Sequence, residues 1–172
     1  MSFKLRDAKP GDEAAIVALI EALADYEKLR DHCVATPEAM RDALFGAEPS
    51  CECVLAELDS GRIAGFALFH KTFSTFLAKP GLWLEDLFVY PDLRGLGIGK
   101  ALIARGAAIC AARGYGRYEW SVLDWNAPSI AFYESLGARR KEGWFTMRLD
   151  GEKLAILGRS DGEKLAALAR KA

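Results

Sequence analysis

The sequence predicts one α+β domain, in which a mixed sheet carries helices on both faces. Three observations support this prediction. Strand-like and helix-like segments alternate along the chain, a glycine-rich turn joins an apolar strand to a helix, and the 172 residues contain no linker. We therefore expect a single domain over residues 1–172, with a core from about 3 to 157 and a C-terminal tail or helix over 158–172.

Hydrophobic spacing defines the expected elements. Alternating or continuous apolar residues predict strands over 3–6, 51–57, 63–72, 82–90, 117–123, 139–150 and 153–157. Apolar residues at helical spacing predict helices over 12–28, 98–113, 126–136 and 161–171. Thr36 followed by Pro37 is typical of a helix start, and this helix should end near Gly46. A turn over 59–62 makes the second and third strands a hairpin.

Composition excludes several classes of protein. The chain is 51% apolar, which excludes disorder, and a net charge of −1 argues against nucleic-acid binding. No stretch is long and apolar enough to span a membrane. Cys33, Cys51, Cys53 and Cys110 show no disulfide framework and no paired metal-ligand spacing. We therefore expect reduced thiols, a cytoplasmic protein and no bound metal.

A glycine-rich turn joins the strand 82–90 to the helix 98–113, and it reads Arg94-Gly95-Leu96-Gly97-Ile98-Gly99. Free backbone N–H groups and the dipole of the following helix make such a turn suitable for phosphate binding. The Walker A motif fails because Ala101 follows Gly99-Lys100, and the dinucleotide motif fails because its third glycine is missing. A nucleotide hydrolase is therefore disfavoured.

The turn resembles the pyrophosphate-binding loop of the GCN5-related N-acetyltransferases (the GNAT family), and the element order resembles that fold from residue 3 to about 157. The resemblance implies a splayed central sheet and acetyl-CoA as co-substrate. It also implies that the strand before the turn pairs with pantetheine and that a later helix touches the cofactor. The cofactor-binding residues so implied are Leu87, Phe88, Val89, Arg94, Gly95, Leu96, Gly97, Ile98, Gly99, Lys100, Asn126, Ala127, Pro128 and Ser129.

Five further segments resemble the diamine acetyltransferase subfamily, which contains spermidine/spermine and thialysine acetyltransferases. These segments are 24–27, 83–86, 122–126, 132–133 and 142–144. Polyamine-specific members carry an acid and a tryptophan where this chain reads Phe73-Ser74-Thr75-Phe76, and the serine resembles the thialysine branch. The resemblance therefore favours a shorter amine or an amino acid over spermidine or spermine.

Acetyl transfer requires a neutral amine, yet a primary amine with a pKa near ~10.4 is only about 0.1% neutral near pH 7.4. A carboxylate can orient the cation and pass its proton to solvent. Glu85 is the candidate, because Trp83-Leu84-Glu85 leads into the cofactor strand. The alternative is a sheet carboxylate paired with a neighbouring base. Adjacent strand residues face opposite sides, so Glu85 and Asp86 should not share a pocket unless a β-bulge intervenes.

Tyr133 is the candidate general acid. Asn126, Ser129, Ile130 and Tyr133 fall on one stripe of the expected helix. The resemblance places the matching tyrosine beside the thioester sulfur, where it protonates the leaving thiolate. A phenol can serve as a general acid, and its ordinary pKa is ~10, against ~8.5 for a thiol. The alternative is an amphipathic core tyrosine.

The resemblance also implies the residues that contact the amine. Acids and aromatic rings suit an ammonium through charge pairing and cation–π contact. The implied substrate-binding residues are Tyr26, Glu27, Glu85, Glu119, Trp120, Ser121 and Glu142. Relatives in this subfamily are homodimers with sites near the interface, so a homodimer is expected.

The sequence therefore predicts an acetyl-CoA-dependent N-acetyltransferase that acts on the primary amine of a small molecule (a thialysine-like amino acid, a diamine or a polyamine) by direct attack on the thioester. Two alternatives stay open. In the first, the enzyme acetylates a protein lysine or N-terminus. In the second, the chain is a non-catalytic module that senses acetyl-CoA. Turnover of free amines separates both alternatives from the first interpretation.

Overall fold

The computed structural model describes residues 2–159. Internal contacts divide the chain into two units, Met1–Leu123 and Asp124–Ala172, and each is described by itself. The first unit holds the sheet, its three α-helices and the glycine-rich turn. The second holds two further helices.

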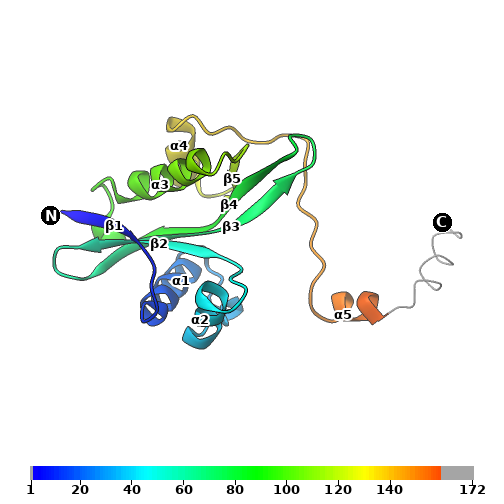
Figure 1. Cartoon of the computed structure of the whole chain (residues 1–172), viewed down its shortest axis with the longest axis horizontal. Helices are drawn as coiled ribbons and strands as arrows, with labels where there is room; N and C mark the ends of the chain where they lie inside the picture. The colour runs from blue at the N-terminus through cyan, green and yellow to red at the C-terminus, as the bar shows by residue number, and fades with distance from the viewer. Residues whose placement is uncertain (1, 160–172) are drawn as a thin grey trace, which may run out of the picture. The chain divides into compact units, whose positions relative to one another are not determined.

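The first unit is built on a five-stranded mixed sheet in the order β1-β2-β3-β4-β5 (Figure 1). The strands are β1 (Phe3–Asp7), β2 (Glu52–Leu58), β3 (Ile63–Ser74), β4 (Lys79–Val89) and β5 (Tyr118–Trp120). Neighbouring strands are antiparallel up to β4, whereas β5 runs parallel to β4. The fold is therefore α+β, as the sequence predicts, although β5 is shorter than the expected strand 117–123.

Helices cover both faces of this sheet, and this prediction is confirmed (Figure 1). The helices are α1 (Glu13–Glu27), α2 (Pro37–Phe45) and α3 (Ile98–Ala112), with short 3-10 helices η1 (Arg30–His32) and η2 (Pro91–Leu93). The Thr36 hydroxyl accepts a hydrogen bond from the Ala39 N–H at 3.2 Å, so the predicted cap of α2 is formed. Helices α1 and α2 lie on one face and α3 lies on the other.

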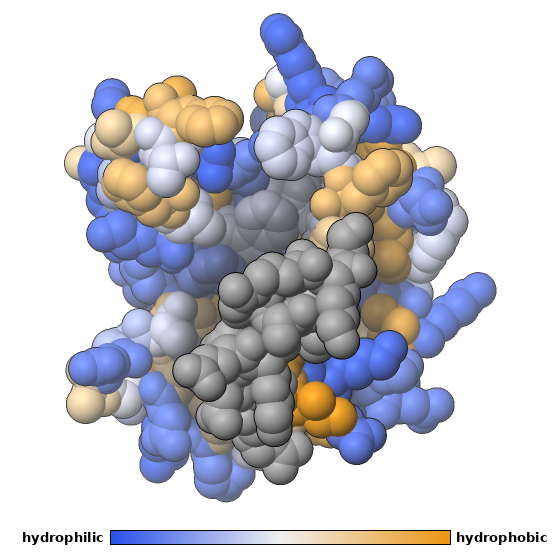
Figure 2. All heavy atoms as spheres, turned by 90° about the vertical axis from the view of Figure 1, so that its right-hand side faces the viewer, coloured by the Kyte–Doolittle hydropathy of each residue, from blue (hydrophilic) through white to orange (hydrophobic). Residues whose placement is uncertain are grey.

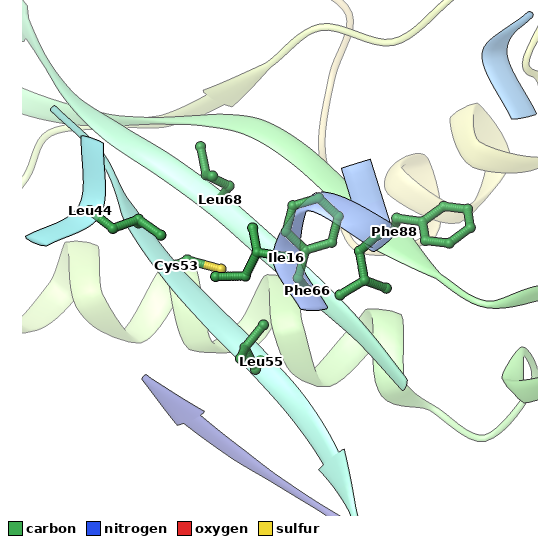
Figure 3. Packing of buried hydrophobic residues seen from close by; sticks show 8 residues of the cluster. Ile16, Leu44, Cys53, Leu55, Phe66, Leu68 and Phe88 are labelled. Atoms are coloured by element: carbon green, nitrogen blue, oxygen red, sulfur yellow. The ribbon is translucent and has the colours of Figure 1, made fainter. Parts of the chain in front are cut away.

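A hydrophobic core fills the layer between the sheet and α1–α2. Its buried members are Ile16, Leu19, Leu44, Cys53, Leu55, Phe66, Leu68 and Phe88. Figure 3 shows these side chains gathered around Ile16 of α1. On the other face, α3 buries Ile98, Leu102 and Ile109, the stripe that helical spacing predicts. Both layers hold β4 in place.

The second unit departs from the sequence prediction at its C-terminal end. Helix α4 (Ala127–Ser135) forms as expected, and Gly137 has the positive φ typical of a helix stop. The two expected strands over 139–150 and 153–157 are wrong: the described residues 139–150 form no strand, and α5 (Gly151–Arg159) is a helix. A helix closes its hydrogen bonds within the segment, whereas a strand needs a neighbouring edge. The expected helix 161–171 lies outside the described residues.

Close approach of β3 and β4 at Gly65 leads to a stability prediction. A Cβ at this position would lie 2.5 Å from the Phe88 carbonyl oxygen and 3.0 Å from Cγ2 of Val89. We expect Gly65→Ala to lower the free energy of unfolding by about 1–3 kcal/mol, because backbone must shift to admit the methyl group. Urea unfolding measures this, and a wild-type midpoint would contradict it.

Candidate functional site

A β-bulge in β4 sets the geometry of the site. Leu68 of β3 lies opposite Asp86, but the next residue, Phe69, lies opposite Leu84, so Glu85 is the extra residue. Asp86 therefore shares a face with Leu68, which packs in the core under α1. Glu85 contacts His70 and Trp83, which alternation places on that same face. The bulge thus overrides the expectation that the two acids face opposite sides.

The bulge brings together a carboxylate cluster, formed by Glu27, Glu85 and Asp86. Burial, followed by the negative charges of Glu85 and Glu27, raises the pKa of Asp86 to about 6. Burial also raises the pKa of Glu27. Both shifts mark a place where negative charge is costly and where a bound cation would relieve that cost. Such an arrangement is suited to holding an ammonium group and exchanging its proton.

Glu85 has two neighbours at one of its oxygens. The indole Nε1–H of Trp83 donates to Oε2 at 2.9 Å, and Nε2 of His70 lies 3.7 Å from the same oxygen. The Glu85 side chain is 56% exposed, so it is accessible to a small molecule. In the alternative interpretation from the sequence, Glu85 is a sheet carboxylate paired with a neighbouring base. His70 is the base that lies next to Glu85.

Beyond the bulge, one edge of β4 carries backbone groups without a strand partner in the described part of the chain. Strand β5 pairs only with Leu82, Trp83 and Leu84, while β3 continues along the other edge as far as Val89. The sheet therefore splays at Glu85, as the resemblance predicts. Backbone groups alternate between the two edges of a strand, and the Phe88 carbonyl faces β3, so Leu87 and Val89 are the residues whose backbone groups face the opening.

The glycine-rich turn follows this edge after the short helix η2. Gly95 and Gly97 both have φ near +81°, and a Cβ at either position would meet no atom within 4 Å. The left-handed backbone favours glycine, and the open space leaves the turn accessible to a bound group. Helix α3 begins at Ile98, and its first N–H groups have no acceptor within the helix. These features fit a pyrophosphate.

Arg94 connects the turn to the C-terminal end of α1. Its Nε–H donates to the Val89 carbonyl at 3.1 Å, and its guanidinium lies 4.9 Å from the centre of the Tyr26 ring and 5.8 Å from that of Phe88. Tyr26 precedes Glu27 at the end of α1. The expected cofactor residue Arg94 and the expected substrate residue Tyr26 therefore touch.

Comparison with known proteins decides the family. The sequence profile described as the acetyltransferase (GNAT) family matches residues 17–138. The chain belongs to this family. It is accordingly an acetyltransferase.

Two curated relatives of this GNAT chain match it over most of their length. A thialysine N-epsilon-acetyltransferase of Sus scrofa is 35% identical over 166 residues, covering 91% of this chain and 97% of the relative. The L-ornithine N5-acetyltransferase NATA1 of Arabidopsis thaliana is 30% identical over 201 residues, covering 91% and 88%. An integron cassette protein of V. cholerae has a similar fold, with a TM-score of 0.78 at 23% identity over 93% of this chain and 99% of its own.

The expected substrate residues of β5 lie on two faces of the GNAT sheet. Glu119 pairs in register with Trp83, on the face of the carboxylate cluster, and forms an ion pair with Arg117. Trp120 pairs in register with Leu84, on the α3 face, and packs edge-on against Tyr118 at 5.2 Å. Ser121 follows the strand and is exposed. Only Glu119 therefore shares a face with the carboxylate cluster.

The second unit holds the remaining expected residues. The Asn126 side chain accepts a hydrogen bond from the Ser129 N–H at 3.3 Å and caps α4, with Pro128 in the first turn. Tyr133 is half-buried one turn further along, with its ring 5.3 Å from that of Phe132. Glu142 is exposed outside any helix or strand. The stripe from Asn126 to Tyr133 is therefore formed on α4.

Sequence patterns alone do not place Asp86 and His70 next to Glu85 in the candidate site. The signal for Asp86 was the adjacent acid pair itself, since bulges are common beside active sites. His70 could be found only from the β3–β4 register, which sets it opposite Trp83.

Across residues 2–159, no helix has the length and apolar character needed to cross a membrane, and no group of His, Cys, Asp or Glu side chains is arranged to hold a metal.

Proposed function

We propose that the protein transfers the acetyl group of acetyl-CoA to a primary amine of a small molecule. The observation that carries this proposal is the carboxylate cluster at the β4 bulge, directly before the open strand edge and the glycine-rich turn. Relatives named for thialysine and ornithine acetylation favour an amino acid or a short diamine as acceptor. The acceptor would enter beside Tyr26, Glu27 and Glu85.

The residues present fit acetyl-CoA. The open edge at Leu87–Val89 would pair with pantetheine, and the turn Arg94–Lys100 would hold the pyrophosphate. The resemblance assigns further contacts with the cofactor to Asn126–Ser129. When bound, acetyl-CoA supplies the activated thioester. The left-handed backbone at Gly95 and Gly97 and the free N–H groups of α3 support this assignment.

The carboxylates and the tyrosine would divide the proton transfers. Glu85 orients the ammonium and assists its deprotonation, and Asp86, with its pKa raised to about 6, is a better proton acceptor than an ordinary carboxylate. The neutral amine then attacks the thioester directly. Tyr133 donates its phenolic proton to the leaving thiolate, since a phenol is ordinarily protonated near neutral pH and so has a proton to give.

The resemblance further leads us to propose a homodimer, and the cysteines, which show no disulfide framework, favour a cytoplasmic location. Exposed apolar side chains at the turn between β3 and β4 support a protein contact there, since Phe73, Phe76 and Leu77 are 60%, 95% and 50% exposed. Figure 2 shows apolar patches (orange) among hydrophilic side chains on one face of the chain. Light scattering on the purified protein tests the dimer, and a monomer mass would contradict it.

Thiol release from acetyl-CoA, measured against a panel of amines, tests the proposed function. The panel contains thialysine, lysine, ornithine, putrescine, spermidine and lysine-containing peptides. We expect preferential turnover of a short amine or amino acid. Turnover of peptides alone would support a protein acceptor instead. Tight acetyl-CoA binding without turnover of any acceptor would support a sensor, and either result would overturn the proposal.

Glu85→Gln should weaken the reaction most at low pH. The amine is hardest to deprotonate there, so loss of the carboxylate should lower kcat/KM about tenfold near pH 6.5 and less near pH 9. Glu48→Gln, which removes an exposed acid from the loop after α2, is the matched control and should leave the profile unchanged. A loss that is uniform across pH would assign Glu85 a purely positioning role.

A further inference from the structure

His70 introduces a basic side chain next to the carboxylate cluster. It lies on β3 opposite Trp83, and its Nε2 is 3.7 Å from Oε2 of Glu85, beyond hydrogen-bond distance. Its side chain is 38% exposed, and Nδ1 lies 3.4 Å from the Lys71 carbonyl oxygen. When protonated, His70 places a positive charge beside a cluster of three carboxylates.

The other cations near the cluster are engaged differently. Arg94 donates to the Val89 carbonyl and stacks on Tyr26, and Arg117 forms an ion pair with Glu119 on β5. The groups that face His70 from the neighbouring elements are Glu85 and Asp86 of β4, Glu119 and Arg117 of β5, Glu27 of α1 and the Cys51 thiol, whose pKa is raised by burial. His70 differs from these two arginines, because it lies beside Glu85 without a hydrogen bond to it.

We propose that His70 selects among amines by a carboxylate, favouring amines that carry a carboxylate next to their second amino group over diamines that lack one. This inference rests on the proposed function, because it assumes that the reacting ammonium binds at Glu85 and Asp86. Once that ammonium neutralises Glu85, protonated His70 attracts a remaining carboxylate and repels a remaining ammonium. His70 therefore acts as a specificity-determining residue rather than a catalytic one.

Matched substrate pairs test this inference directly. Lysine and cadaverine differ only by the α-carboxylate, as do ornithine and putrescine. We expect His70→Gln to reduce the lysine/cadaverine and ornithine/putrescine ratios of kcat/KM by about three- to tenfold near pH 6.5. Each ratio cancels effects on folding, on acetyl-CoA binding and on the reacting ammonium, which are common to both members of a pair.

The pH dependence gives a readout that a structural role would not produce. A preference that depends on the charge of an imidazole should be larger at acidic than at alkaline pH, and it should fall toward that of the variant near pH 8.5. His32→Gln is the matched control, since His32 is the other histidine of the chain and lies on η1. Unchanged ratios in His70→Gln, or an equal change in His32→Gln, would overturn the inference.

Binding measurements separate this inference from the proposed function. Dissociation constants of the same four amines, measured by calorimetry with coenzyme A present, give the same two ratios without turnover. Absence of thiol release with every amine would refute the proposed function alone. Ratios of dissociation constants that do not differ between the wild type and His70→Gln would refute the role of His70 alone.

Discussion

Asp86→Asn is expected to abolish most of the activity and yet to stabilise the fold. The carboxylate that would accept a proton from the amine is lost, so kcat/KM should fall by about 10²–10³-fold while the affinity for acetyl-CoA is unchanged. The asparagine removes a charge that the folded protein accommodates poorly. Activity and stability should therefore change in opposite directions.

The sign of the stability change follows from the raised pKa of Asp86. Burial and the charges of Glu85 and Glu27 raise this pKa to about 6, so the folded state holds the proton more tightly than the unfolded state does. Protonated Asp86 therefore contributes to the free energy of unfolding at acidic pH, and this contribution is lost as the pH rises from about 4 through about 6. A shift of this size corresponds to about 2–3 kcal/mol.

Urea unfolding of the wild type and of Asp86→Asn at several pH values measures this difference. The two proteins should have similar stability near pH 4, and the variant should be more stable near pH 8. Glu48→Gln removes one exposed negative charge and should show no such divergence. A variant that is less stable than the wild type near pH 8 would show that Asp86 is held by favourable contacts instead.

Much of the fold could be predicted because local signals decide it. Thr36 and Pro37 start α2 through a side-chain cap, and the stripe of Ile98, Leu102 and Ile109 is buried on α3 as helical spacing requires. The glycine-rich turn is also predictable from the sequence, since the left-handed backbone at Gly95 and Gly97 depends only on local residues. These features depend on neighbours in sequence.

The C-terminal segment was predicted wrongly for the opposite reason. Alternating apolar residues predict a strand only if a partner edge is available, and that partner is chosen by tertiary contacts. Leu154 and Leu157 recur at helical spacing, and the Leu154 N–H bonds to the Asp150 carbonyl at 3.2 Å, which opens α5. The segment 153–157 satisfies both patterns, so periodicity alone does not separate them.

Only part of the candidate site could be predicted from the sequence. Motifs pointed to Glu85 and Tyr26, whereas the role of Asp86 depends on the bulge, which the register against Leu68 and Phe69 creates. The alternation of side chains along β4 does not show where this strand holds an extra residue, because the bulge is defined only by the register with β3. The raised pKa of Asp86 is likewise a product of burial and of Glu27, which is distant in sequence.

Tyr133→Phe should lower kcat by about 10²-fold with little effect on the affinity for acetyl-CoA. The substitution removes one hydroxyl group from α4 and keeps the ring that packs against Phe132, so the helix should be preserved. If the phenol protonates the leaving thiolate, the chemical step alone is slowed. Tyr115→Phe, which removes a hydroxyl after the end of α3, is the matched control and should retain the wild-type kcat.

The leaving group provides the decisive comparison for Tyr133. An acetyl thioester of an acidic aromatic thiol releases a thiolate that needs no proton, so general-acid catalysis contributes little to its reaction. The wild type and Tyr133→Phe should therefore acetylate an amine at similar rates from this donor, although they differ about 10²-fold with acetyl-CoA. An equal deficit with both donors would mean that Tyr133 positions the substrates. A full rate with acetyl-CoA would remove it from the mechanism.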